Sequence, residues 1–101
     1  MLVQFTIFPT DQGESVSGFV ASAIKIVEDS GLPYKLGPMS TSIEGEWGEI
    51  LAVINRCRKE LRKRSKRVYI VISVDDREGA SGRIEGKIRD VAEKLGHEPK
   101  T

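Results

Sequence analysis

The side chains with the widest chemical range lie together between Tyr34 and Trp47. This segment, YKLGPMSTSIEGEW, combines aromatic rings, hydroxyl groups, carboxylates and glycines. Aromatic and apolar atoms can sandwich a flat ligand ring, while a carboxylate accepts hydrogen bonds from the ligand or pairs with a cation. The segment is therefore a candidate small-molecule site, although a hairpin with ordinary polar surface residues would have the same composition.

Residues for nucleophilic or metal chemistry are sparse. The single histidine, His97, falls in the C-terminal tail, so a Ser–His or Cys–His pair with an orienting group is not expected. The single cysteine, Cys57, falls on the apolar stripe of a helix and reads as a core residue. One histidine and one cysteine lack metal-ligand spacing, and no glycine-rich phosphate loop occurs. We therefore expect no catalytic residue, no metal and no cofactor.

A basic run stands between Arg56 and Arg67. Eight of its residues are basic, against the single acid Glu60. Such a run can bind phosphates of nucleic acid, or it can be a solvated helix end whose cations complement the helix dipole. No aromatic side chain interleaves the run to stack bases. The second interpretation is therefore favoured, and a nucleic-acid-binding module using residues 56–67 is the alternative function.

Length and composition limit the class of protein. The chain has 101 residues, 39% hydrophobic and 31% charged, which predicts one globular domain over residues 1–101. No apolar run approaches the roughly 20 residues of a membrane span. The first residues lack the positive n-region of a secretory signal, and one unpaired cysteine fits a reducing cytosol, so a cytoplasmic protein without a membrane partner is expected. Residues 1–50 hold seven acidic and two basic side chains, whereas residues 51–101 hold eight acidic and fourteen basic.

Hydrophobic periodicity predicts the elements that position these groups. Alternation of apolar residues indicates strands, and apolar spacings of three and four indicate helices. Ser15 is a candidate N-cap of the first helix, and Gly31 is typical of a helix C-terminus. Residues 96–101 are expected to fray. The predicted elements are a strand at Leu2–Phe8, a helix from Val16 to Gly31, short strands at Pro33–Met39 and Thr41–Glu46, a helix at Trp47–Arg64, a strand at Arg67–Asp75 and a helix at Arg83–Leu95.

This order predicts an α+β ferredoxin-like sandwich, βαββαβ plus a C-terminal helix, with two helices on one face of a four-stranded sheet. An enzyme on this fold, such as an acylphosphatase, would need an arginine after the first strand, and Thr10–Glu14 contains none. The predicted core face of the sheet comprises Val3, Phe5, Ile7, Val68, Ile70 and Ile72. The opposite face, called the open face below, comprises Leu2, Gln4, Thr6, Phe8, Tyr69, Val71 and Ser73. Because the open face is half apolar, we expect self-association through it, unless the last helix folds back over it.

The chain also resembles a known family. The resemblance rests on Phe5-Thr-Ile-Phe-Pro9, Ser30-Gly-Leu-Pro-Tyr34, Pro38-Met-Ser-Thr41-Ser-Ile-Glu44-Gly45 and Asp75-Asp-Arg77. These motifs are similar to those of the YkoF-like thiamine-binding proteins, over about residues 3–95. The resemblance implies a ferredoxin-like fold, assembly into a homodimer or homotetramer, and binding of thiamine or its hydroxymethylpyrimidine moiety without chemistry.

The resemblance also implies site residues. Its threonine and glutamate fall on Thr41 and Glu44, and its serine at the start of the first helix falls on Ser17 or Ser15. The predicted ligand-binding set is Ser15, Ser17, Tyr34, Thr41, Ile43, Glu44 and Trp47. Strict alternation places Thr41 and Glu44 on opposite faces of their strand, so they share a pocket only if a bulge or strand end intervenes or if the pocket spans two chains. In the rival interpretation Glu44 is structural, bound to a backbone N–H or to an arginine of a neighbouring chain.

Overall fold

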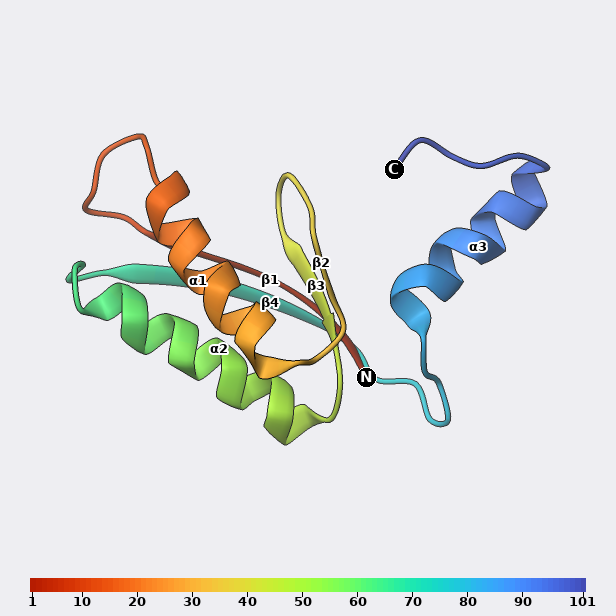
Figure 1. The fold of residues 1–101 in the computed structure, drawn as a ribbon, viewed down its shortest axis with the longest axis horizontal. Helices are drawn as coiled ribbons and strands as arrows, with labels where there is room; N and C mark the ends of the chain where they lie inside the picture. Colours follow the sequence, from red (N-terminus) through yellow and green to blue (C-terminus); the bar gives the residue numbers. More distant parts are fainter.

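The computed structural model describes residues 1–101, and its elements follow the predicted order (Figure 1). The elements are β1 (Leu2–Pro9), α1 (Ser17–Ser30), β2 (Tyr34–Leu36), β3 (Thr41–Glu44), α2 (Trp47–Arg62), β4 (Val68–Asp75) and α3 (Arg83–Leu95). The four strands form one antiparallel sheet in the order β2-β3-β1-β4. This is the ferredoxin-like arrangement, which confirms the predicted fold class.

The core lies between the sheet and the helices α1 and α2. Alternate residues of β1 point into it, namely Val3, Phe5 and Ile7, together with Ile43 of β3. The helices contribute one stripe each, which includes Val27 of α1. Cys57 of α2 is fully buried in this cluster, as predicted. Both helices cover one face of the sheet and leave the other face to solvent or to a partner.

Several boundaries differ from the predictions. The N-cap of α1 is Val16 and makes no side-chain capping bond, so the prediction of Ser15 as N-cap was wrong. The strand β3 ends at Glu44 because the next residues form the start of α2, where Glu46 and Glu49 build a capping box. The helix α2 ends at Arg62, two residues earlier than predicted. Gly31 ends α1 in the left-handed conformation, as predicted.

The predicted core face is only partly correct on β4. Val68 and Ile70 are half-buried, whereas Ile72 and Val74 are 39% and 41% exposed. The reason is the position of β4 at the edge of the sheet, where it pairs with β1 alone and lies at the margin of the helical layer. The outer edge of β4 therefore combines unpaired backbone groups with partly exposed apolar side chains.

The last helix, α3, projects from the body of the fold (Figure 1). It spans Arg83–Leu95 as predicted, but it folds over the open face only at its own N-terminal end. The Cα radius of gyration is 14.9 Å, against about 13 Å for a compact chain of this length. Tyr69 and Val71, on the edge strand β4 of the open face, are about half exposed. No helix of the chain is both long and apolar enough to cross a membrane.

Candidate functional site

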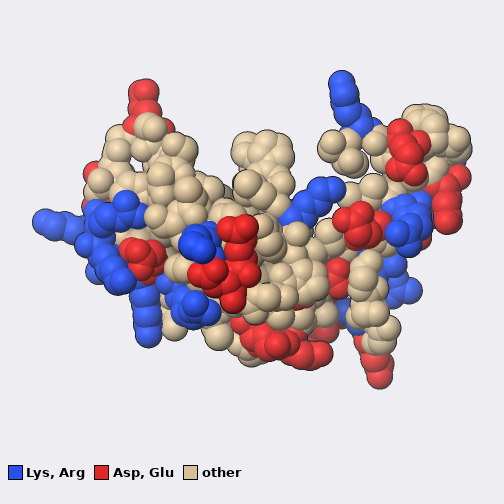
Figure 2. Space-filling model, viewed as in Figure 1, with Lys and Arg blue, Asp and Glu red and all other residues tan.

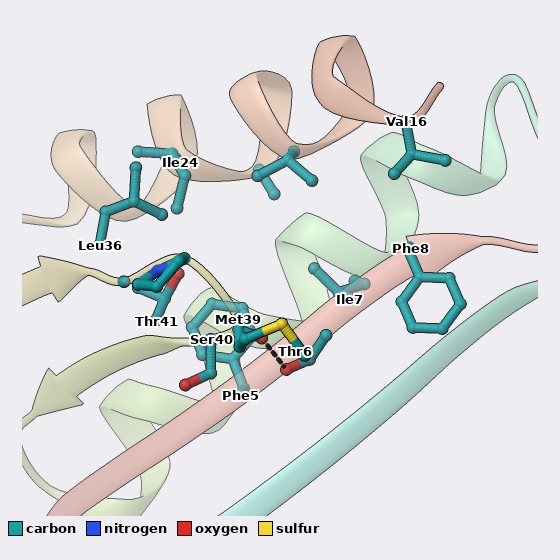
Figure 3. Close-up of a pocket in the computed structure, with 14 residues that line it drawn as sticks. Phe5, Thr6, Ile7, Phe8, Val16, Ile24, Leu36, Met39, Ser40 and Thr41 are labelled. Atoms are coloured by element: carbon teal, nitrogen blue, oxygen red, sulfur yellow. Dashed lines mark hydrogen bonds between the residues drawn. The ribbon is translucent and has the colours of Figure 1, made fainter. Parts of the chain in front are cut away.

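A cavity of about 260 Å³ lies between α1 and the tip of the β2–β3 hairpin (Figure 3). It forms because β1 is longer than its neighbour: β3 pairs with β1 only as far as Phe5, while β1 continues to Pro9 beside β4. The hairpin loop curls over the free edge of β1. The 14 residues that line the cavity are Phe5, Thr6, Ile7, Phe8, Val16, Val20, Ala23, Ile24, Leu36, Gly37, Pro38, Met39, Ser40 and Thr41.

Two hydrogen bonds hold the loop at the cavity. The hydroxyl of Thr6 donates to the carbonyl oxygen of Met39 at 3.0 Å (Figure 3). The hydroxyl of Ser40 donates to the side-chain oxygen of Gln4 at 3.2 Å. Both bonds tie the loop to β1, so the position of the hairpin tip is set by the strand it covers.

The lining is apolar apart from three hydroxyl groups, those of Thr6, Ser40 and Thr41. Thr41 is 5% exposed as a residue, but its hydroxyl is not fully buried: the one fully buried side-chain polar atom without a partner is Nε of Arg83. Water in the cavity can reach this hydroxyl of Thr41, and a ligand atom that accepts or donates a hydrogen bond could replace that water. No charged side chain lines the cavity, so it suits an uncharged ring with one or two polar atoms.

The mouth of the cavity carries exposed apolar side chains. Met39 is 83% exposed and Leu36 is 54% exposed, and both line the cavity from the hairpin. A ligand ring seated in the cavity would bury part of both side chains. The hydrophobic effect would then favour the bound state, by about 25 cal/mol for each Å² of apolar surface removed from water.

Thr41 and Glu44 lie on opposite faces of β3. Thr41 pairs with Phe5 and shares its core-facing side, whereas Glu44 pairs with Leu2 and lies on the open face. No bulge interrupts this register. The two residues of the motif therefore cannot contact one small ligand within a single chain.

Glu44 is held by α3. Its carboxylate oxygen Oε1 accepts a hydrogen bond of 2.6 Å from the backbone N–H of Ile84, in the first turn of the helix. The positive end of the helix dipole favours a carboxylate at this position. Covered in this way, Glu44 is 8% exposed although it stands on the open face. This hydrogen bond from a backbone N–H is the contact that the structural interpretation of Glu44 expects. A role of Glu44 in ligand binding stays a prediction.

The other predicted ligand residues are scattered. Ser15 and Ser17 are exposed and flank Val16, which lines the cavity. Ile43 is fully buried in the core and does not line the cavity. Trp47 is half exposed as the first residue of α2. Tyr34 lies against the core, where burial raises the pKa of its phenol and the neighbouring Glu28 carboxylate raises it further.

The prediction missed most of the cavity lining. Val16, Val20 and Ile24 follow the apolar periodicity of α1, and nothing in their spacing separates cavity-facing from core-facing positions. The signal that was available is the unequal length of the strands. A long first strand beside a short third strand must leave part of its edge free, and a hairpin loop in that place can enclose a cavity.

The basic run lies at the C-terminal end of α2 and beyond it, at the left of the molecule in Figure 2. Several of its cations have partners within the chain. Arg64 stacks on the ring of Phe19 at 4.4 Å and donates to the hydroxyl of Ser22 at 3.0 Å. Arg62 donates to the carbonyl oxygen of Ser65 at 3.2 Å. These contacts give part of the run a structural role.

The ferredoxin-like sandwich carries an uncharged, largely apolar cavity at its hairpin tip, a lining that is typical of small-molecule sites. The family model described as "Thiamine-binding protein" matches residues 3–92. The chain therefore belongs to the thiamine-binding protein family.

Its relatives share the whole domain. The chain is 40% identical to a UPF0045 protein of Mycobacterium bovis over 92 residues, which cover 90% of each chain. It is 35% identical to the UPF0045 protein YqgV of Bacillus subtilis over 100 residues, 93% of this chain and 96% of that protein. The crystal structure of a hypothetical protein from Methanocaldococcus jannaschii superposes with a TM-score of 0.84 at 27% identity, covering 91% of this chain and 95% of the other.

Proposed function

We propose that the protein binds thiamine or its hydroxymethylpyrimidine moiety, without chemistry, in the cavity between α1 and the hairpin tip. The observation that carries the proposal is the cavity itself, which places the hydroxyl of Thr41 among largely apolar walls. Membership of the thiamine-binding protein family supports this ligand class. The wall offers no acid, no histidine and no thiol, which favours binding over catalysis.

The size of the cavity favours one ring. An apolar cavity of about 150 Å³ accommodates benzene, and drug-sized ligands occupy about 300–1,000 Å³. A cavity of about 260 Å³ fits a substituted aminopyrimidine and leaves the remainder of thiamine outside. In this arrangement Thr41 hydrogen-bonds the pyrimidine, while Ser15 and Ser17 lie beside the part of the ligand that protrudes.

Calorimetry with thiamine, thiamine phosphates and hydroxymethylpyrimidine tests the proposal. Thr41→Val keeps the shape of the side chain and removes its hydroxyl, so we expect affinity to fall about 5- to 10-fold. Thr41→Ser keeps the hydroxyl and is expected to bind within a few-fold of the parent protein. Equal affinities of these two variants would contradict the hydrogen bond of Thr41.

A second pair of variants tests the location. Val20→Trp fills the cavity from α1 and is expected to abolish binding, whereas Ala21→Trp places the same ring on the exposed side of the helix and is expected to leave binding intact. If neither variant alters binding of a ligand that the parent protein binds, the site lies elsewhere. If no ligand of this class stabilises the parent protein against heat, the proposal fails as a whole.

We also propose that the chain forms a homodimer or homotetramer through the open face or the β4 edge. Tyr69 is 52% exposed and Val71 is 48% exposed, on a strand whose outer backbone groups have no partner. An exposed apolar edge strand of eight residues favours pairing with another chain.

A further inference from the structure

The attachment of α3 differs from that of α1 and α2. None of the eleven residues in the core cluster comes from α3, and Ala92 is its only buried residue. Val91 and Leu95, on the apolar stripe of the helix, are about half exposed. The βαββαβ body therefore closes its core without α3, and the helix contributes little to it.

Two polar contacts hold α3 on the open face. Glu44 Oε1 accepts from the Ile84 N–H at 2.6 Å, and Lys87 Nζ pairs with Asp75 Oδ2 at 2.6 Å. In the sheet register Leu2 pairs with Glu44 on one side and with Asp75 on the other, so both carboxylates flank Leu2 at one end of the open face. The helix thus presents a backbone N–H and an ammonium group to two acids on the strands that flank β1.

The connection to α3 permits movement. Residues 76–82 are largely exposed, and their one backbone hydrogen bond to each other joins Ala80 to Arg77. Gly79 and Gly82 adopt φ angles of +72° and +62°, which glycine adopts at no steric cost. The linker therefore has few hydrogen bonds that constrain its conformation.

We infer that α3 is a reversible latch, which docks on the Leu2 end of the open face through Glu44 and Asp75 and detaches while the body stays folded. An ion pair at the surface is screened by salt, so salt favours detachment. A free helix of 13 residues is only marginally stable in water, so α3 unfolds when it detaches. In the docked state the Glu44 carboxylate is closed to ligands that approach from the open face, and detachment exposes it.

Hydrogen exchange of the intact chain, resolved by residue, tests the latch. We expect the amides of α3 to exchange much faster than those of α1 and α2, and to exchange faster still as salt is raised. Glu44→Ala should accelerate exchange of α3 about 10- to 150-fold, the effect of losing a hydrogen bond to a charged group. Lys87→Ala should accelerate it about 2- to 5-fold.

Arg89→Ala is the matched control for Lys87→Ala. Arg89→Ala removes a cation two residues after Lys87. Arg89 is exposed and makes no ion pair, so this change should leave the exchange of α3 unchanged. If Glu44→Ala does not fold, Glu44→Gln keeps the shape of the side chain and should give a smaller acceleration. The inference is overturned if α3 exchanges at the rate of α2, or if Lys87→Ala and Arg89→Ala have equal effects.

Discussion

Asp11 joins two loops that are far apart in the sequence. Its Oδ1 accepts a hydrogen bond of 2.5 Å from the hydroxyl of Ser65, and its Oδ2 accepts one of 2.8 Å from the backbone N–H of Lys66. Ser65 is buried, so the carboxylate also satisfies a polar group that water does not reach. The loop after β1, which leads into the cavity-lining start of α1, is fixed in this way to the loop before β4.

These hydrogen bonds make the loop contact dependent on pH. The bond from Ser65, followed by that from Lys66, lowers the pKa of Asp11 from 3.8 to about 2. Because the folded-state pKa is depressed, the stabilisation is complete above about pH 4 and is lost as the pH falls through about 2. We expect Asp11→Asn to melt below the parent protein at neutral pH, and the difference to shrink between pH 4 and pH 2.

Thermal melts of the parent protein and of Asp11→Asn across this pH range measure the difference in melting temperature. Glu14→Gln serves as the control, because Glu14 is exposed in the same loop and makes no hydrogen bond through its side chain. Its melting temperature should follow that of the parent at every pH. A difference between Asp11→Asn and the parent that stays constant down to pH 2 would contradict the assignment to the Asp11 carboxylate.

The β2–β3 hairpin is the element on which the cavity depends. Its tip closes through a hydrogen bond of 2.9 Å from the N–H of Gly37 to the carbonyl oxygen of Ser40. A Cβ atom at Gly37 would lie 2.9 Å from that same oxygen. Since the neighbour is backbone, it cannot move aside as a flexible side chain would, and the tip must shift.

We therefore expect Gly37→Ala to displace the hairpin tip and to destabilise the fold by about 1–3 kcal/mol, the usual cost of overpacking. Ligand binding in the cavity should weaken with it. Gly48→Ala is the matched control: Gly48 lies in α2, a Cβ there meets nothing within 4 Å, and the change should be neutral or stabilising. Denaturant unfolding of the parent protein, Gly37→Ala and Gly48→Ala gives their free energies of unfolding. Equal free energies for the two variants would contradict the predicted clash at Gly37.

The longer elements β1, α1 and α2 were predictable because each has a strong local pattern. Alternation along Leu2–Phe8 and the helical stripes of α1 and α2 identify their buried faces without any knowledge of the fold, and βαββαβ order then defines the sandwich. Alternation also predicts that Thr41 and Glu44 face opposite sides. The cavity was not predictable, and the contact of Glu44 with a backbone N–H could be stated only as an alternative. Both depend on tertiary placement: where β3 ends beside β1, and where α3 returns to the sheet.

Charges of opposite sign mark the two ends of α2. Acidic residues stand near its start, where Glu46 and Glu49 cap the helix, and the basic run follows at its end (Figure 2). This distribution complements the helix dipole. The distribution accounts for the basic run without a bound nucleic acid, because cations near the C-terminus of a helix stabilise that helix.

Nucleic-acid binding should accordingly be weak. We expect RNA or DNA oligomers to bind with dissociation constants above about 1 μM at physiological salt, and the affinity to fall steeply as salt rises, as it does for non-specific contacts. Filter binding or fluorescence anisotropy measures this. Tighter binding that is abolished by Arg58→Ala together with Lys59→Ala would favour the nucleic-acid-binding module instead.

The proposed assembly is testable at Val71, on the open face of the edge strand β4. Val71→Glu would place an unpaired charge in a desolvated contact, at a cost of about 3–5 kcal/mol, and should weaken association more than 100-fold. Light scattering should then report a mass near the 11.2 kDa of one chain. Ala52→Glu, on the exposed side of α2, should leave the assembly intact. A parent protein that is already monomeric at high micromolar concentration would contradict the assembly itself.

The burial of Cys57 makes the protein convenient for site-directed labelling. Desolvation raises the pKa of its thiol to about 11, and the side chain has no exposed surface. Maleimide reagents need an accessible thiolate, so the parent chain should remain unmodified at neutral pH. A cysteine introduced on α3 or at the hairpin tip would then carry a fluorophore or spin label alone, and motions of the two segments could be followed without first replacing the native thiol.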